Sequence, residues 1–186
     1  VKRDGTIWFT DPPYGILSDY EGYRSEQEQD GCYVFCFDPA SGDLKVVADD
    51  FKKPNGLAFS PDESILYIAD TGRSHDPDFP AHIRMFDVSG KNNLKNGKGF
   101  TDIDDGLSDG FRVDVEGNVW SSAGHGVHCY NPSGALLGRI KTGKAVSNVT
   151  FGGPRRNTLF ITCTERVYSI ALGVADVVAD VVETGT

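Results

Sequence analysis

The stretch KPNGLAFSPDESILYIADT, residues 53–71, decides the predicted fold. Residues 56–59 and 65–69 are apolar runs of strand length, separated by the polar segment 60–63. That segment places Pro61 at the second position of a tight turn, where the fixed φ angle of proline is favourable. The stretch therefore predicts a β-hairpin.

The same hairpin recurs along the chain with a nearly constant spacing. In each copy an Asn or Asp opens the first strand and an aromatic residue lies in the second, at the pairs Asn55 and Tyr67, Asp109 and Trp120, and Asn148 and Phe160. Trp8 follows the same kind of turn, but the matching position for its Asn or Asp falls before Val1. We expect the chain to begin within a repeat.

A second pattern follows the hairpins in the same register. An aromatic residue, an Asp or Asn and a glycine turn recur at residues 37–42, 86–90 and 130–134. A four-strand unit that repeats every 40–60 residues or so is typical of β-propeller blades. A β-sandwich whose hairpins resemble one another by chance fits less well, because two independent spacings stay in step.

The predicted fold class is thus all-β, a β-propeller with about four blades in this chain. Residues 1–172 form the partial propeller, with an incomplete first blade, and the structure of the tail at 173–186 is left unassigned. Two connections, residues 12–31 and 71–81, are longer than a compact domain needs, which is typical of functional or disordered loops.

The composition limits the classes of partner and the cellular compartment that we expect. The net charge of −9 argues against nucleic acid or an anionic membrane as the main partner. No apolar run approaches the ~20 residues of a membrane span. Cys32 and Cys36 would lie about 13 Å apart on a strand, at ~3.3 Å per residue, too far for a disulfide. The four cysteines match no metal or redox motif, which favours a reducing compartment such as the cytoplasm, although the compartment itself stays undetermined.

Strand geometry predicts which residues share a face. In an antiparallel hairpin the start of the first strand and the end of the second lie at the same edge. Asn55, Asp109 and Asn148, which open first strands, should therefore lie near Asp11 and Asp70, which end second strands. Both long loops leave from this edge, so it is the expected functional face. The turns at residues 60–63 and 116–118 should lie at the far face.

A ring of amide and carboxylate oxygens suits a hard cation such as Ca²⁺ or Mg²⁺. Such an ion can polarise a carbonyl and activate water while a neighbouring Asp acts as base. The alternative for Asn55 is a local role, capping a strand or turn through backbone hydrogen bonds. The repeat favours the metal interpretation. The chain has no Gly-Xaa-Ser-Xaa-Gly nucleophile elbow, no His-Glu-Xaa-Xaa-His zinc motif and no phosphate-binding loop.

Four segments carry a resemblance to a known family: DGTIWFTDPPYG (4–15), PNGLAFSPD (54–62), DGFRVD with GNVW (109–114 and 117–120), and NVTFGG (148–153). In combination they resemble the gluconolactonase/regucalcin (senescence marker protein) family of six-bladed propellers, over residues 4 to about 172. The resemblance implies hydrolysis of sugar lactones at one divalent cation, Ca²⁺ first, with Zn²⁺ or Mg²⁺ as alternatives.

The resemblance also implies roles for individual residues. Asn55 matches a metal-binding Asn, and Asp109 matches the metal-binding Asp that is the expected general base. The family's Glu ligand and a further Asn are expected before Val1. Asn148, Asp11 and Asp70 are weaker candidates, behind the ligands or at the rim of the site. Arg73 and His75 are candidates for contact with a polyhydroxylated acid, against the alternative of a solvated loop.

Three functions are therefore compared. The first is a metal-dependent lactonase whose partner is a small lactone, with no nucleic acid and no membrane involved. The second is a phosphotriesterase-like or arylesterase hydrolase on the same fold. The third is a non-catalytic Ca²⁺-binding regulator or interaction platform.

Overall fold

The structure, a computed structural model, describes residues 1–90 and 92–177. Strands account for nearly all of its regular structure and form four antiparallel sheets, each with its strands in chain order. The sheets comprise β1 (Ile7–Asp11), β2 (Cys32–Asp38) and β3 (Asp43–Phe51); β4 (Pro54–Phe59), β5 (Ile65–Asp70), β6 (His82–Ser89) and β7 (Asn93–Asp102); β8 (Phe111–Val113), β9 (Val119–Ala123), β10 (Gly126–Tyr130) and β11 (Leu136–Lys141); and β12 (Val146–Gly152), β13 (Thr158–Cys163) and β14 (Arg166–Ala171).

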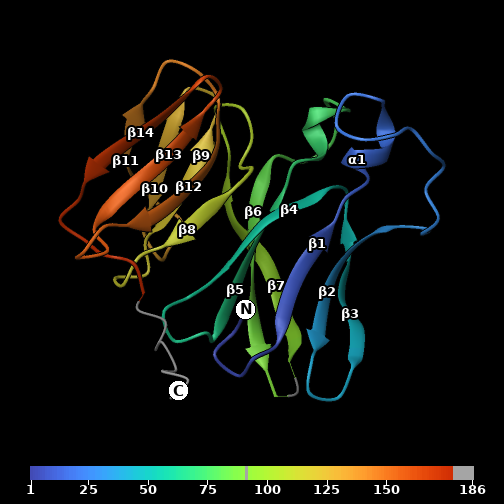
Figure 1. The fold of residues 1–186 in the computed structure, drawn as a ribbon. Helices are drawn as coiled ribbons and strands as arrows, with labels where there is room; N and C mark the ends of the chain where they lie inside the picture. The colour runs from blue at the N-terminus through green and yellow to red at the C-terminus, as the bar shows by residue number, and fades with distance from the viewer. Residues whose placement is uncertain (91, 178–186) are drawn as a thin grey trace, which may run out of the picture.

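The first strands of the four sheets lie side by side and in chain order. β1 contacts β4, β4 contacts β8, and β8 contacts β12, while the later strands of each sheet lead away from this line (Figure 1). Four sheets joined through their first strands are successive blades of a β-propeller. The predicted fold class is confirmed.

Three apolar clusters fill the three spaces between neighbouring blades. Because side chains alternate across a strand, β5 supplies two of them: Leu66 and Ile68 pack towards the first blade, and Tyr67 and Ala69 pack towards the third. A third cluster, which includes Val127 and several residues of β12 and β13, joins the last two blades. Burial on both faces of the second blade therefore explains why residues 65–69 form a continuous apolar run.

Two strand boundaries have identifiable physical reasons. β8 ends at Val113 because the buried Asp114 carboxylate accepts the backbone N–H of Glu116 and Asn118 and the indole N–H of Trp120. β7 begins at Asn93, although its first half is polar. The backbone of an outer strand pairs with a neighbouring strand on one side only, so the sequence of such a strand need not be apolar.

The two end sheets expose apolar side chains. Ile7 and Phe9 on β1 are 38% and 39% exposed, and Val167 and Ile170 on β14 are 69% and 40% exposed. No helix among residues 1–90 and 92–177 is long and apolar enough to cross a membrane.

The start of the predicted tail packs on the third and fourth blades. The Val115 N–H donates to the Ala175 carbonyl at 3.0 Å, Asp114 and Asp176 form an isolated β-bridge, and Arg156 pairs with Asp176. Residues 178–186 of the unassigned tail lie outside the described residues.

Two glycines set the approach of neighbouring blades. The Gly56 N–H donates to the Asp109 carbonyl at 2.8 Å, and the Gly110 N–H donates to the Ser147 carbonyl at 2.9 Å. A Cβ on Gly56 would lie 2.3 Å from the Asp109 carbonyl oxygen, and a Cβ on Gly110 would lie 2.3 Å from the Asn148 side chain. Any larger residue would therefore force the blades apart.

The substitution Gly56→Ala should destabilise the protein by roughly 1–3 kcal/mol, the usual cost of overpacking a fixed contact. The measurement is urea unfolding followed by circular dichroism. Gly99→Ala is the matched control, because a Cβ there meets no atom within 4 Å. Equal stability of the two variants would show that the blades do not need this close approach.

His128 is a buried histidine between the second and third blades. It is 2% exposed on β10, and its Nδ1 lies 3.1 Å from the Tyr130 hydroxyl. Burial lowers the His128 pKa from its ordinary 6.5, Arg139 lowers it further, and Asp104 and Asp105 oppose the shift. The folded state therefore resists protonation of a group that the unfolded chain protonates freely.

Since the unfolded state binds this proton more readily, the stability contributed by neutral His128 is complete above pH 6.5 and is lost as the pH falls below it. We expect His128→Gln to reduce the fall in unfolding free energy between pH 7 and 5, measured by urea denaturation at each pH. His75→Gln, which changes an exposed histidine, is the control. An unchanged pH dependence in His128→Gln would contradict the assignment.

Candidate functional site

The strand ends predicted to share a face lie at one common edge of the first and second blades. The start of β4 pairs with the end of β5, with Pro54 opposite Asp70. Both long loops leave from this edge: residues 12–31, which contain α1 (Tyr14–Leu17), and residues 71–81, which contain η1 (Gly72–Ser74). α1 and η1 lie close together over it (Figure 1), and the Tyr14 hydroxyl contacts Ser74 at 2.9 Å.

Asn55 and Asp109 meet at this edge from two different blades. The Asn55 side-chain N–H donates to Asp109 Oδ1 at 2.6 Å, across 54 positions of sequence. Both residues are held from behind, since the Thr10 hydroxyl donates to the Asn55 carbonyl at 2.8 Å and the Asp109 N–H donates to the Ser122 hydroxyl at 2.8 Å. The two residues singled out as metal ligands are therefore brought together.

The pair lines a pocket of about 480 Å³. Most of the lining is polar, and it comes from the two long loops together with the starts of the blade strands: Tyr14, Leu17, Ser18, Tyr20, Glu21, Asn55, Thr71, Ser74, His75, Leu107 and Asp109. Hydroxyl, amide, imidazole and carboxylate groups thus converge on one hollow, the arrangement expected of a small-molecule site.

The Asp109 carboxyl is the perturbed group in this pocket. Burial raises its pKa above the ordinary 3.8, the hydrogen bond from Asn55 opposes that rise, and the charge of Glu21 adds to it. A carboxyl with a raised pKa is a better proton acceptor when ionised than a free aspartate is. Perturbed carboxyls in pockets are typical of functional sites.

The donor atoms at the pair are compatible with a hard cation. Both N–H groups of Asn55 are used, on Asp109 and on Thr71 at 3.3 Å, so the amide oxygen Oδ1 is left for another partner. Oxygen donors of this kind suit Ca²⁺ or Mg²⁺. Within residues 1–90 and 92–177, no three His, Cys, Asp or Glu side chains gather as a metal cluster. The described chain thus offers two oxygen ligands for an ion.

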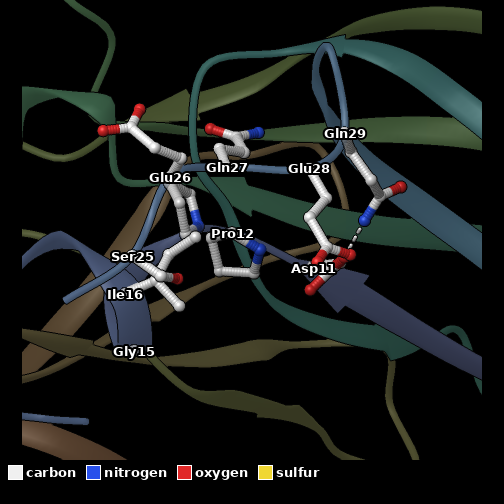
Figure 2. Close-up of a pocket in the computed structure, with 10 residues that line it drawn as sticks. Asp11, Pro12, Gly15, Ile16, Ser25, Glu26, Gln27, Glu28 and Gln29 are labelled. Carbon is white, nitrogen blue, oxygen red and sulfur yellow. Dashed lines mark hydrogen bonds between the residues drawn. The ribbon is translucent and has the colours of Figure 1, made fainter. Parts of the chain in front are cut away.

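Asp70 and Asp11 lie at the same edge with different surroundings. Asp70 is buried, and its carboxylate accepts the backbone N–H groups of Lys52, Lys53 and Gly72, at 2.8 to 3.0 Å. Asp11 accepts a hydrogen bond from Gln29 and lines a separate pocket of about 420 Å³ under the first long loop (Figure 2). Asp70 orders the entry to β4, and Asp11 orders the loop.

The three remaining candidates are divided between the pocket and its surroundings. His75 lines the pocket, whereas Arg73 is exposed on η1 and does not line it. Asn148 packs against Gly110, and its Oδ1 accepts the backbone N–H of Val149 at 2.8 Å. Asn148 therefore borders the residue after Asp109, with its side-chain oxygen occupied locally.

Sequence patterns did not single out six polar residues of the lining: Tyr14, Ser18, Tyr20, Glu21, Thr71 and Ser74. All six lie on the two long loops, whose length and position at the edge were the available signal. The repeat gives no register to loop residues, so it does not indicate which of them face the pocket.

Comparison with known proteins identifies the family. The SMP-30/Gluconolactonase/LRE-like region matches residues 1–165. A gluconolactonase of Zymomonas mobilis subsp. mobilis is 34% identical over 177 residues, covering 91% of this chain and 48% of that protein. Lactonohydrolase oryL of Aspergillus oryzae is 31% identical over 177 residues, covering 86% of this chain and 40% of that protein.

A solved structure agrees with these relatives. A gluconolactonase from Xanthomonas campestris superposes with a TM-score of 0.83 at 38% identity, covering 92% of this chain and 55% of that one. The chain spans about half the length of the relatives it matches, or less. With the match over residues 1–165, these similarities show that the chain belongs to the SMP-30/gluconolactonase/LRE-like family.

Proposed function

We propose that this protein hydrolyses sugar lactones to hydroxy acids. Asn55 and Asp109 would hold a divalent cation, most readily Ca²⁺, with Zn²⁺ or Mg²⁺ as alternatives, and Asp109 would act as general base. The observation that carries the proposal is the 2.6 Å contact between Asn55 and Asp109, from two blades, in the wall of a polar pocket.

The relatives support the reaction class. Two of them are named as a gluconolactonase and a lactonohydrolase, and the chain aligns with each over most of its own length. The pocket supports a hydroxylated substrate, because the hydroxyl groups of Ser18 and Tyr20 line it and can exchange hydrogen bonds with a polyol ring.

The residues of this chain divide the chemistry between them. Water adds to the lactone carbonyl carbon, the ring C–O bond breaks, and the proton lost by water ends on the released ring oxygen. A bound divalent cation would supply positive charge beside the carbonyl oxygen. Asn55 fixes Asp109 Oδ1, which leaves Oδ2 to accept the proton of the attacking water.

The first experiment is a substrate panel of sugar lactones and aryl esters, with and without a chelator. We expect lactone hydrolysis that chelation abolishes and Ca²⁺ restores. Preference for aryl esters would support the esterase alternative. Metal binding without turnover of any substrate would support the non-catalytic regulator and overturn the lactonase proposal.

Asp109→Asn should lower kcat for lactone hydrolysis by at least ~10²-fold, the lower range for loss of a positioned base. The measurement is steady-state kinetics at saturating cation. Asp49→Asn, which changes an exposed carboxylate on β3, should keep the wild-type rate. A near-normal rate in Asp109→Asn would remove this carboxylate from the mechanism.

Asn55→Ala should weaken divalent-cation affinity by about tenfold or more, because it removes an oxygen ligand and frees the Asp109 carboxylate from its hydrogen bond. Titration calorimetry measures this directly, without turnover. Asn131→Ala, which changes a turn asparagine in the third blade, is the control. If the two variants bind the cation equally well, Asn55 is not a ligand.

A further inference from the structure

A continuous chain of hydrogen bonds runs along one wall of the Asn55–Asp109 pocket. It begins at the Lys53 carbonyl, which lies 3.2 Å from the Thr71 hydroxyl. The Thr71 hydroxyl lies 2.7 Å from the Tyr14 hydroxyl, which lies 2.9 Å from the Ser74 hydroxyl. The Ser74 hydroxyl lies 2.8 Å from Nδ1 of His75. We call these five residues the hydroxyl chain.

The direction of every hydrogen bond in the hydroxyl chain follows from its first member. A backbone carbonyl only accepts, so Thr71 donates its single hydroxyl proton to Lys53. The Tyr14 proton must then go to Thr71, whose hydroxyl oxygen lies 2.7 Å and whose carbonyl oxygen lies 3.3 Å from the Tyr14 hydroxyl. In either case Ser74 must donate to the Tyr14 oxygen, because each hydroxyl has only one proton. Only this assignment of donors and acceptors makes a hydrogen bond of each of the four contacts.

The last link fixes the tautomer of His75. Since the Ser74 proton is used on Tyr14, the Ser74 oxygen can only accept, and His75 Nδ1 must carry a proton. In the neutral imidazole the other nitrogen, Nε2, is then an acceptor. His75 is exposed and lines the pocket, with its ring 5.6 Å from the Tyr14 ring, centroid to centroid.

The same chain orients the proposed metal ligand. The Thr71 oxygen accepts from the Asn55 amide as well as from Tyr14, which directs the amide nitrogen of Asn55 towards Thr71 and Asp109. The nitrogen and the oxygen of an asparagine amide are told apart by the hydrogen bonds that surround them. The Asn55 oxygen is therefore the atom left for a cation.

From this geometry we propose that the hydroxyl chain makes His75 a specificity-determining residue, whose Nε2 accepts a hydrogen bond from a hydroxyl group of the substrate. Tyr14 is then a positioning residue that sets both His75 and Asn55. The proposal rests on the proposed lactonase function and deepens it: the site selects lactones whose ring carries hydroxyl groups over those with an unsubstituted ring.

The tautomer is tested without turnover. Long-range ¹H–¹⁵N NMR of the full chain at pH ~8.5, where histidine is neutral, distinguishes a protonated Nδ1 from a protonated Nε2. We expect His75 to carry its proton on Nδ1 in the wild type. In Tyr14→Phe, Ser74 is free to donate to Nδ1, so the proton should move to Nε2. A wild-type His75 protonated on Nε2 would overturn the proposal.

Specificity is tested with two matched substrates, a polyhydroxylated δ-lactone and δ-valerolactone, which has the same ring without hydroxyl groups. His75→Phe should lower kcat/KM for the hydroxylated lactone by about tenfold, the scale of one hydrogen bond, and leave valerolactone unchanged within about twofold. Asp78→Asn, an exposed change on the same loop, should affect neither substrate.

The outcomes separate the two proposals. An equal loss on both lactones, or no loss on either, would overturn the role of His75 while leaving the lactonase intact. If neither lactone is hydrolysed by the wild type, the proposed function fails, and with it the specificity role of His75. The NMR measurement would still decide the direction of the hydroxyl chain.

Discussion

The close approach of neighbouring inner strands is the constraint on which the site depends. At Gly56 and Gly110 the backbone N–H of one blade reaches a carbonyl of the next, at 2.8 and 2.9 Å. The residue just before each glycine is thereby held at the start of an inner strand, beside the neighbouring blade. Asn55 and Asp109 occupy those positions, so the backbone contact between their blades brings the two candidate ligands close enough for the Asn55 side chain to donate to Asp109 Oδ1 at 2.6 Å.

The rigid and the variable parts of the molecule have separate tasks. Asn55 and Asp109 are set by strand pairing and by contacts between blades, which allow little movement. The rest of the pocket comes from the loops at residues 12–31 and 71–81, which Tyr14 ties together through Thr71 and Ser74. In the proposed function, the reacting groups lie on the sheet and the recognition groups lie on the loops, a division common among enzymes built on rigid scaffolds.

Sequence spacing predicted the parts that repeat. The repeated hairpin predicted the blades, and antiparallel geometry predicted the shared edge of Asn55 and Asp109, because the start of the first strand and the end of the second lie at one edge. Sequence spacing did not predict the polar start of β7, because the backbone pairing of this outer strand needs no apolar pattern. It also missed Tyr14 and Glu21, because loop side chains are placed by contacts distant in sequence, such as that between Tyr14 and Thr71.

The charges of the pocket support the proposed cation on separate grounds. Its lining includes the carboxylates of Glu21 and Asp109 but no lysine or arginine. Burial and the charge of Glu21 both raise the Asp109 pKa, so the ionised form that a base requires is disfavoured by its own surroundings. The Asn55 amide compensates only in part, since it carries no net charge. A divalent cation held by the same oxygens would offset both penalties and favour the ionised form of Asp109.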